Sequence, residues 1–185
     1  MAFICVGWRY LSFLYDIFIC NMIEFIKATT TEQCKTTALL ANNIWREHYT
    51  KIIGKAQVDF MLEKFQSANA IKQQIAEGYM YYIITVEATA IGYISIKKED
   101  KNLFLSKFYV IKPERGKGFG KTAMTFLETK AKALNCNSIS LTVNKNNGNA
   151  INAYEKLGFN NVGTIVIDIG KGFVMDDYKM CKELT

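Results

Sequence analysis

Apolar, β-branched and aromatic residues occur along this chain in seven short runs, and each run predicts a β-strand. The strands are expected at residues 23–28, 79–86, 90–97, 103–111, 138–143, 162–169 and 173–181. Between the first two runs, apolar residues such as Leu40 and Ile44 recur at the i, i+4 spacing of one helix face. The long gap between these runs is therefore expected to be helical.

Two helices are expected in that gap. The first begins at the capping sequence of residues 29–33, which offers overlapping T-x-x-[EQ] registers, and ends near His48. Gly54 breaks the pattern, and a second helical region is expected at residues 56–76 with an interruption near Ser67. Gly78 follows as a typical helix end.

The order of the predicted elements, β-α-α-β-β-β-α-β-α-β-β, indicates one domain of the α/β (α+β) class. Short turns join residues 79–86 to 90–97 and residues 162–169 to 173–181, so these pairs are expected to form hairpins. Phe119, Ala123 and Phe126 give the helix after the fourth strand an apolar face. We expect a mixed, mostly antiparallel central sheet with helices on both faces.

Residues 1–21 differ in composition from the rest of the chain and are expected to lie outside a domain of residues 22–185. The stretch is long and apolar enough for a membrane anchor, but Arg9 and Asp16 interrupt it, and each is costly near a bilayer centre. It lacks the features of a secretory signal. We prefer Met22 as the working start, and the anchor stays open as an alternative.

Composition narrows the range of partners. The formal net charge is +6 without an uninterrupted basic run, which could attract an anionic ligand but does not indicate nucleic-acid binding. The 5 cysteines are widely spaced and show no metal-ligand pattern, so neither a metal site nor a disulfide framework is expected. Reduced cysteines favour a cytoplasmic location.

A glycine-rich turn after the fourth strand carries candidate chemistry. It reads R-G-K-G-F-G from Arg115 to Gly120 and is followed by a helical pattern. Glycines permit positive φ and close approach to bare amides, and the helix N-terminus adds its N–H groups and dipole, which together suit a pyrophosphate. The spacing differs from the G-x-x-x-x-G-K-[ST] loop, and no βαβ unit precedes it as in dinucleotide-binding folds. On its own, the motif could be merely a turn.

A second motif follows the strand at residues 138–143. Residues 147–159 read N-G-N-A-I-N-A-Y-E-K-L-G-F. Together, R-x-x-G-x-G and N-x-x-A-x-x-x-Y-x-K-x-G-F resemble the paired signature of the GCN5-related N-acetyltransferase (GNAT) family, and the resemblance covers roughly residues 22–184. It implies the GNAT fold, acetyl-CoA as co-substrate without a metal, and acetyl transfer to an amine.

By this resemblance, the turn amides hold the pyrophosphate of acetyl-CoA, with Arg115 and Lys117 adding charge at the rim. The main chain of the fourth strand pairs with the pantetheine arm, and the amide of Val110 polarises the thioester carbonyl. The residues expected to bind the cofactor are Phe108, Tyr109, Val110, Arg115, Gly116, Lys117, Gly118, Phe119, Gly120, Lys121, Asn147 and Tyr154.

Tyr154 corresponds to the general acid of the family. A phenol with a reference pKa of about 10 is protonated at neutral pH and can donate to the departing thiolate. The alternative is that Tyr154 is a core aromatic residue of an amphipathic helix. Asn147 matches a cofactor-contacting Asn and could also cap this helix.

The general base is left open by the sequence. Some family members carry a Glu on the strand before the second motif, but Thr142 stands here and cannot accept the proton. His48, which follows Glu47 at the end of the first helix, is one candidate, because that segment borders the acceptor site in the family. A water chain ending on a carboxylate is the other.

The acceptor is expected to be a small amine, with a polyamine as the first candidate. Residues 45–71 look similar to the acceptor-side helices of bacterial polyamine-type acetyltransferases. Carboxylates and aromatic rings could line a channel for the cation; these are Glu47, Tyr49, Asp59, Phe60, Glu63, Tyr81 and Tyr82. The predicted acceptor residues are Glu47, His48, Tyr49 and Tyr82.

Two alternatives remain: a protein or peptide N-acetyltransferase, and a non-catalytic CoA-binding module. Tyr154 argues against the second, because a module that only binds CoA has no use for an acid at the leaving group. A homodimer is also left open.

Overall fold

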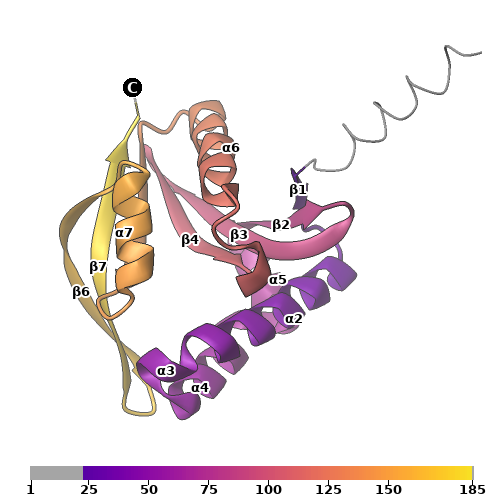
Figure 1. The fold of residues 1–185 in the computed structure, drawn as a ribbon, viewed down its shortest axis with the longest axis vertical. Coiled ribbons are helices and arrows are strands. Elements are labelled where there is room, and N and C mark those ends of the chain that lie inside the picture. The colour runs from indigo at the N-terminus through magenta and orange to yellow at the C-terminus, as the bar shows by residue number, and fades with distance from the viewer. Residues whose placement is uncertain (1–22, 185) are drawn as a thin grey trace, which may run out of the picture.

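The computed structural model describes residues 23–184, so the expected extension at residues 1–21 lies outside the described residues. The seven expected strands are present and form one sheet (Figure 1). They are β1 (Ile23–Lys27), β2 (Met80–Val86), β3 (Thr89–Glu99), β4 (Asn102–Val110), β5 (Ser138–Asn144), β6 (Asn160–Gly170) and β7 (Phe173–Glu183).

The helices also follow the expected order. They are α2 (Thr31–His48), α3 (Thr50–Ile53), α4 (Lys55–Gln66), α5 (Ala68–Ala76), α6 (Phe119–Ala133) and α7 (Gly148–Lys156), with a 3₁₀ turn at Lys112–Glu114. A capping box starts α2, since the Gln33 amide donates to Thr30 Oγ1 and the Thr30 amide donates to Gln33 Oε1. The single-turn helix α3 was not expected, because four residues are too few to show a periodic pattern.

The sheet is mixed and mostly antiparallel, as expected, with the strand order β1-β2-β3-β4-β5-β7-β6. Among the strands of residues 23–184, only β4 and β5 are parallel neighbours. Only their first residues pair: Asn102 with Ser138, Leu103 with Ile139 and Phe104 with Ser140. Beyond these pairs the two strands separate. This divergence leaves one edge of β4 without a neighbouring strand and opens space between β4 and β5.

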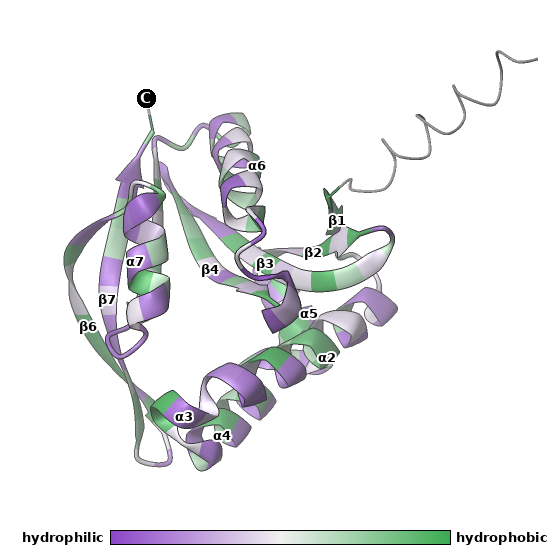
Figure 2. Ribbon diagram, viewed as in Figure 1, coloured by the Kyte–Doolittle hydropathy of each residue, from purple (hydrophilic) through white to green (hydrophobic). Residues whose placement is uncertain are grey.

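Helices cover both faces of the sheet, and each face has its own hydrophobic core. On one face, α6 and α7 cover a core that includes Leu127 and Met180. On the other face, α2, α4 and α5 pack over a core that includes Ile44, Val58 and Tyr81. In Figure 2, hydrophobic residues follow the strands and the sheet-facing sides of the helices. Among residues 23–184, no helix is long and apolar enough to cross a bilayer.

Gly92 holds β3 and β4 unusually close together. A Cβ atom at this position would lie 2.3 Å from the carbonyl oxygen of Tyr109, so any larger residue would push the strands apart. The contact fixes the main chain of β4 at the point where its other edge faces open space.

Candidate active site

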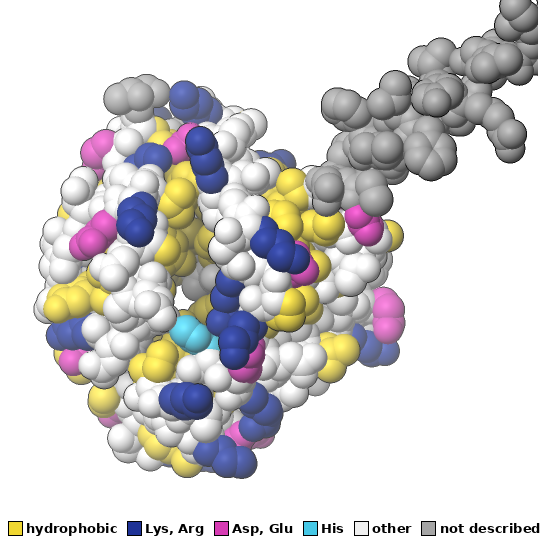
Figure 3. Space-filling model, in the orientation of Figure 1, with side chains coloured by type: hydrophobic (Ala, Val, Ile, Leu, Met, Phe, Trp, Pro, Cys, Tyr) yellow, Lys and Arg dark blue, Asp and Glu magenta, His cyan; other side chains and the backbone are white. Residues whose placement is uncertain are grey.

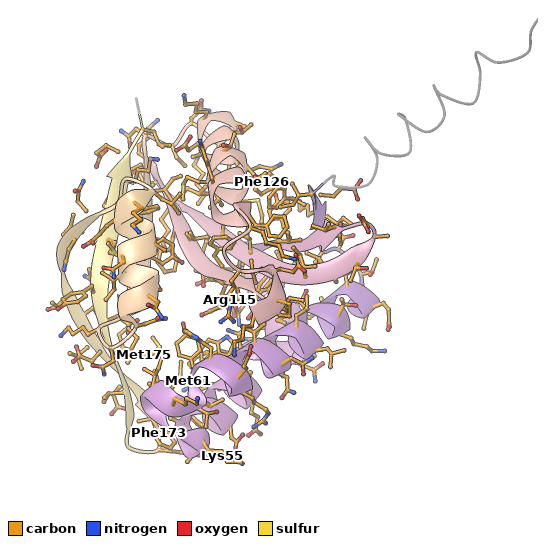
Figure 4. The ribbon with its side chains drawn as sticks, viewed as in Figure 1. Lys55, Met61, Arg115, Phe126, Phe173 and Met175 are labelled. Carbon is orange, nitrogen blue, oxygen red and sulfur yellow. The ribbon has the colours of Figure 1, made fainter. Side chains whose placement is uncertain are left out.

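A cleft of about 1450 Å³ lies where β4 and β5 diverge. Pockets for single small ligands usually measure about 300–1,000 Å³, so this cleft has room for a cofactor and an acceptor together. Figure 3 shows the molecule hollowed at the centre of this face, with basic side chains and the cyan histidine at the rim. Arg115 and Met175 come from opposite walls of the cleft (Figure 4).

The glycine-rich turn forms a backbone cradle at one end of the cleft. Gly116 and Gly118 have φ angles of 80° and 88°, in the left-handed region that favours glycine. Gly118 is the N-cap residue of α6 and gives it no side-chain hydrogen bond, so the amides of the first turn are not capped by a side chain. Cβ atoms built on Gly116, Gly118 and Gly120 would meet no atom within 4 Å. Uncapped amides beside open space suit an anionic group.

The two basic residues of the turn have different partners. Arg115 Nε donates to the carbonyl oxygen of Val110 at 2.8 Å, and its Nη2 lies 3.9 Å from Glu47 Oε2. Arg115 lines the cleft. Lys117 instead pairs with Glu114 at 2.9 Å and does not line the cleft, so of the two predicted basic residues only Arg115 lines it.

The free edge of β4 presents main-chain groups to the cleft. The amide of Ile111 donates to the carbonyl oxygen of Ile91 at 2.8 Å, toward β3. Because successive residues of a strand point their N–H groups to opposite sides, the amide of Val110 points away from β3, into the cleft. The carbonyl oxygen of Val110 faces the same way and accepts from Arg115. This orientation is the one required of an amide that polarises a ligand carbonyl.

Tyr154 lies in the cleft wall on α7, beside the edge of the Phe159 ring at 5.6 Å. Burial raises the pKa of its phenol above the usual value, and the nearby Tyr49 raises it further. The phenol is therefore fully protonated at neutral pH and can act as a proton donor. Tyr154 also packs against the core under α7, so the same side chain both contributes to the core and lines the cleft.

Asn147 joins α7 to the helices on the other side of the cleft. Its Oδ1 accepts from the Ala150 amide at 3.4 Å, which confirms it as the cap of α7. Its Nδ2 donates to the phenol oxygen of Tyr49, also at 3.4 Å. The Tyr49 ring lies tilted against Trp45 and edge-on to Tyr109, with ring centroids 4.6 and 6.2 Å apart. A wall of aromatic rings thus borders the middle of the cleft.

His48 lies at the cleft rim next to Tyr49, with ring centroids 4.8 Å apart. Partial burial lowers the pKa of its imidazole, and the positive charge of Arg115 lowers it further. The side chain is therefore neutral at pH 7 and able to accept a proton, but a second positive charge beside Arg115 would be unfavourable.

Some predicted acceptor residues do not reach the cleft. Tyr82 lies on the α6 face of the sheet, with its ring 5.0 Å from Phe126, because adjacent residues of a strand point to opposite faces. Glu47 does not line the cleft and pairs at its rim with Lys112 and Arg115. Other proposed channel residues are also not in the cleft lining; these are Asp59, Phe60, Glu63 and Tyr81.

Asp59 shows why the position of a carboxylate on a helix was not enough to predict that it lines the cleft. Its carboxylate forms ion pairs with Arg46 and Lys55, the latter at 2.7 Å, on the outer side of α2 and α4. These cations lower the pKa of the carboxyl group, so it is already neutralised by protein partners. Acidic side chains on surface helices usually lie at the solvent-exposed side, as Asp59 does here.

Two buried ionisable residues in the cleft were missed by the sequence analysis. Asp177 on β7 is 8% exposed, and burial raises the pKa of its carboxyl group. Lys107 on β4 is also 8% exposed, and burial lowers the pKa of its amine to about 8. Its Nζ donates to Gln74 Oε1 at 2.8 Å. The signal in the sequence was the presence of charged residues within strand patterns.

No group of three or more His, Cys, Asp or Glu side chains among residues 23–184 is arranged to hold a metal ion. The three described cysteines, Cys34, Cys136 and Cys181, are unpaired with one another.

Comparison with known proteins bears on this site. Residues 41–159, which include both motifs, match the model of the acetyltransferase (GNAT) family. No curated protein matches the sequence significantly.

Many solved structures share the fold, including the following three. The PaiA N-acetyltransferase of Thermoplasma acidophilum, in complex with coenzyme A, superposes with a TM-score of 0.73 at 20% identity, over 88% of this chain and 99% of that one. The protein yncA of Salmonella typhimurium, with its cofactor acetyl-CoA, gives 0.59 at 18% identity, over 90% and 95%. The ribosomal-protein-S18-alanine N-acetyltransferase of Escherichia coli gives 0.63 at 17% identity, over 89% and 95%.

Proposed function

Because this chain belongs to the acetyltransferase (GNAT) family, it is an acetyl-CoA-dependent N-acetyltransferase, and we propose that its acceptor is the amine of a small molecule. In this proposal, acetyl-CoA lies with its pyrophosphate at the turn from Arg115 to Lys121 and its thioester near the Val110 amide. Tyr154 donates a proton to the thiolate as the carbon–sulfur bond breaks.

The observation that supports a small-molecule acceptor is a bridge between α4 and the β6–β7 hairpin at one end of the cleft. There α4 is tied to the β6–β7 hairpin: Gln57 Nε2 donates to the Val174 carbonyl oxygen at 2.8 Å, and Lys64 Nζ donates to that of Ile169 at 2.6 Å. The rings of Phe60 and Phe173 meet at 5.5 Å beside these bonds. A protein chain would need an open groove, whereas this end is bridged.

The side chains that line this end of the cleft indicate the chemistry of the acceptor. Apolar side chains from α3, α4, β6 and β7 surround it; they are Ile53, Met61, Ile165, Ile167 and Met175. Among the acidic residues of the cleft, Asp177 comes from the same strands. This end of the cleft therefore favours a molecule with an apolar part next to a cationic amine.

A polyamine remains the first compound to test, although the carboxylates first expected to bind it lie elsewhere. Acidic residues do occur along the cleft, namely Glu77, Glu99, Glu114 and Asp177. Spaced carboxylates along an extended cleft suit a molecule with more than one ammonium group. The cytoplasmic location and the homodimer stay predictions from the sequence.

The deciding experiment measures thiol release from acetyl-CoA by the full chain, with mass spectrometry of the product. The amine panel comprises spermidine, an aminoglycoside, an amino acid and a peptide with a free N-terminus. We expect acetylation of a small amine with a specificity constant at least 100-fold above that of the peptide. Preferential acetylation of the peptide would replace this proposal with the protein-acetyltransferase alternative. Acetyl-CoA binding with no turnover on any amine would favour the non-catalytic module.

A further inference from the structure

The acceptor amine must lose a proton before it attacks the thioester, because an alkyl ammonium has a pKa of about 10.4. Thr142 on β5 cannot take that proton. The neighbouring strand supplies a carboxylate at the same place, since β5 pairs with β7 so that Thr142 faces Lys179 and Asn144 faces Asp177. We propose that Asp177 is the general base of this enzyme; this role rests on the proposed acetylation of a small amine.

The side-chain direction of Asp177 follows from the alternation along both strands. Val143 on β5 and Tyr178 and Met180 on β7 pack into the core under α6 and α7. Their neighbours Thr142 and Asp177 therefore point to the opposite face of the sheet, where both line the cleft. Asp177 thus faces the bridged acceptor end rather than the cradle of α6.

The surroundings of Asp177 favour a visiting cation. Among residues 23–184, no Lys or Arg forms an ion pair with this carboxylate, although it is 8% exposed. Lys145, whose charge acts on Asp177, pairs instead with Asp176, which points to the other face of β7. Lys179, two residues along β7, also lines the cleft. A buried carboxylate without a cationic partner is costly, and an ammonium group of the acceptor would supply that partner.

The groups around Asp177 also set its proton affinity. Burial is the main influence and raises the pKa of the carboxyl group, and the negative charge of Asp176 raises it further. Hydrogen bonding by Thr142 and Asn144 and the charge of Lys145 act in the opposite direction without reversing the shift. Across the cleft, the phenol of Tyr49 interacts electrostatically with Asp177, and burial raises the pKa of that phenol and keeps it neutral. The raised pKa of the carboxyl group is closer to the pKa of the acceptor ammonium group, so the carboxylate is a better base.

Charge distinguishes Asp177 from His48. A proton accepted by His48 would create an imidazolium near Arg115, whose charge already lowers the pKa of that ring. A proton moving from an ammonium group to Asp177 instead leaves a neutral amine beside a neutral carboxylic acid. In a partly dry cleft, the transfer that removes charge is favoured over the one that adds it.

The proton balance of the reaction closes with this assignment. Asp177 takes one proton from the ammonium group, and the freed nitrogen lone pair forms a bond to the thioester carbon. The tetrahedral adduct breaks its carbon–sulfur bond, and Tyr154 gives its proton to the thiolate. The second proton of the attacking nitrogen returns to Tyr154, and Asp177 releases its proton to water.

The test compares Asp177→Asn with the wild type, using whichever amine the wild type acetylates. We expect kcat to fall by about 10²–10⁴-fold at pH 7.5, as for other lost general bases, with the Kd for acetyl-CoA unchanged. The acidic limb of the kcat/KM profile should also disappear. The deficit should shrink as pH approaches the pKa of the amine, because the substrate then arrives deprotonated.

Two controls separate this role from a structural one. Asp176→Asn alters the adjacent carboxylate on the opposite face. It should keep the rate at pH 7.5 and an acidic limb, moved to lower pH because a charge that raises the pKa of Asp177 is lost. Asp177→Glu retains a carboxylate and should recover part of the lost rate. An active wild type with an unaffected Asp177→Asn variant would overturn the role of Asp177 alone, as would an equal deficit at every pH. A wild type without turnover on any amine would overturn the proposed function and this role with it.

Discussion

The side-chain amide of Asn147 donates to the phenol oxygen of Tyr49 at 3.4 Å, joining the N-terminus of α7 to the end of α2. The two residues lie on opposite sides of the cleft, one in the second cofactor motif and one in the predicted acceptor segment. The same Asn147 side chain caps α7 through the Ala150 amide. Asn147 therefore stabilises the first turn of α7 and also links the two walls of the cleft.

Replacing Asn147 with Ala should remove both interactions. We expect the free energy of unfolding to fall by about 1 kcal/mol, the usual cost of a lost N-cap, and the Kd for acetyl-CoA to rise. Urea unfolding and calorimetry measure the two effects. Tyr49→Phe removes the bond across the cleft and leaves the cap of α7 intact, so it should reproduce the weaker binding with less loss of stability. Equal unfolding free energies in Asn147→Ala and wild type would contradict the capping role.

Replacing Gly118 with Val should abolish acetyl-CoA binding. The φ angle of 88° at Gly118 places its backbone where a β-branched residue is strained, so the turn and the first amides of α6 would move. Gly172 in the β6–β7 turn is a matched control, because its φ angle is 76° and it lies outside the cleft lining. Gly172→Val should lose stability but still bind acetyl-CoA in calorimetry. Normal binding by Gly118→Val would show that the pyrophosphate lies elsewhere.

Replacing Tyr154 with Phe should lower kcat by about 10²–10⁴-fold with an unchanged Kd for acetyl-CoA. Burial raises the pKa of the wild-type phenol, so its ionisation should not reduce activity at any pH up to about 10. Steady-state rates from pH 6 to 10 check both statements. Tyr178→Phe, an aromatic residue packed on the same core outside the cleft lining, should retain full turnover. A falling rate centred below pH 9 that disappears in Tyr154→Phe would contradict the raised pKa.

Titration of the Lys107 amine should make the free energy of unfolding rise with pH. Burial lowers its pKa from 10.5 to about 8, so at pH 7 the folded protein holds a charge that is costly to bury. Between pH 8 and 10.5 the unfolded state binds more protons than the folded state, and the free energy of unfolding therefore increases with pH. Lys107→Met removes this dependence and should be more stable than wild type at pH 7.

The measurement is urea unfolding of wild type and Lys107→Met at pH 7 and 9.5. The stability difference between them should narrow at the higher pH. Lys98→Met, an exposed lysine on the neighbouring strand β3, should follow the pH dependence of the wild type. A difference that is the same at both pH values would show that the Lys107 amine titrates normally.

Local sequence was enough to locate the parts of this protein that are built from contiguous residues. The turn around Gly118 and the cap at Asn147 were both predicted, because each motif and the structure it forms occupy the same few residues. The seven strands were also found from their patterns, with ends within a few residues of the predicted ones. The general architecture followed from the order of those elements.

The positions of side chains within the cleft depended on which strands became neighbours. Tyr82 was expected at the acceptor but packs on Phe126, since its direction is set by its place in β2 and by the position of α6. Asp59 was expected to face a substrate but is neutralised by Arg46 and Lys55. Both outcomes depend on contacts that helix or strand patterns do not contain.

Asp177 shows the same division most clearly. The sequence by itself determined the family motifs, the order of the strands along the chain and the absence of a carboxylate at Thr142. Only the tertiary structure placed Asp177 in the cleft, because β7 pairs with β5 in the register that sets Asp177 opposite Asn144. Local conformation is governed by neighbouring residues, whereas a site assembled from separate strands depends on their pairing and on the direction in which each side chain then points.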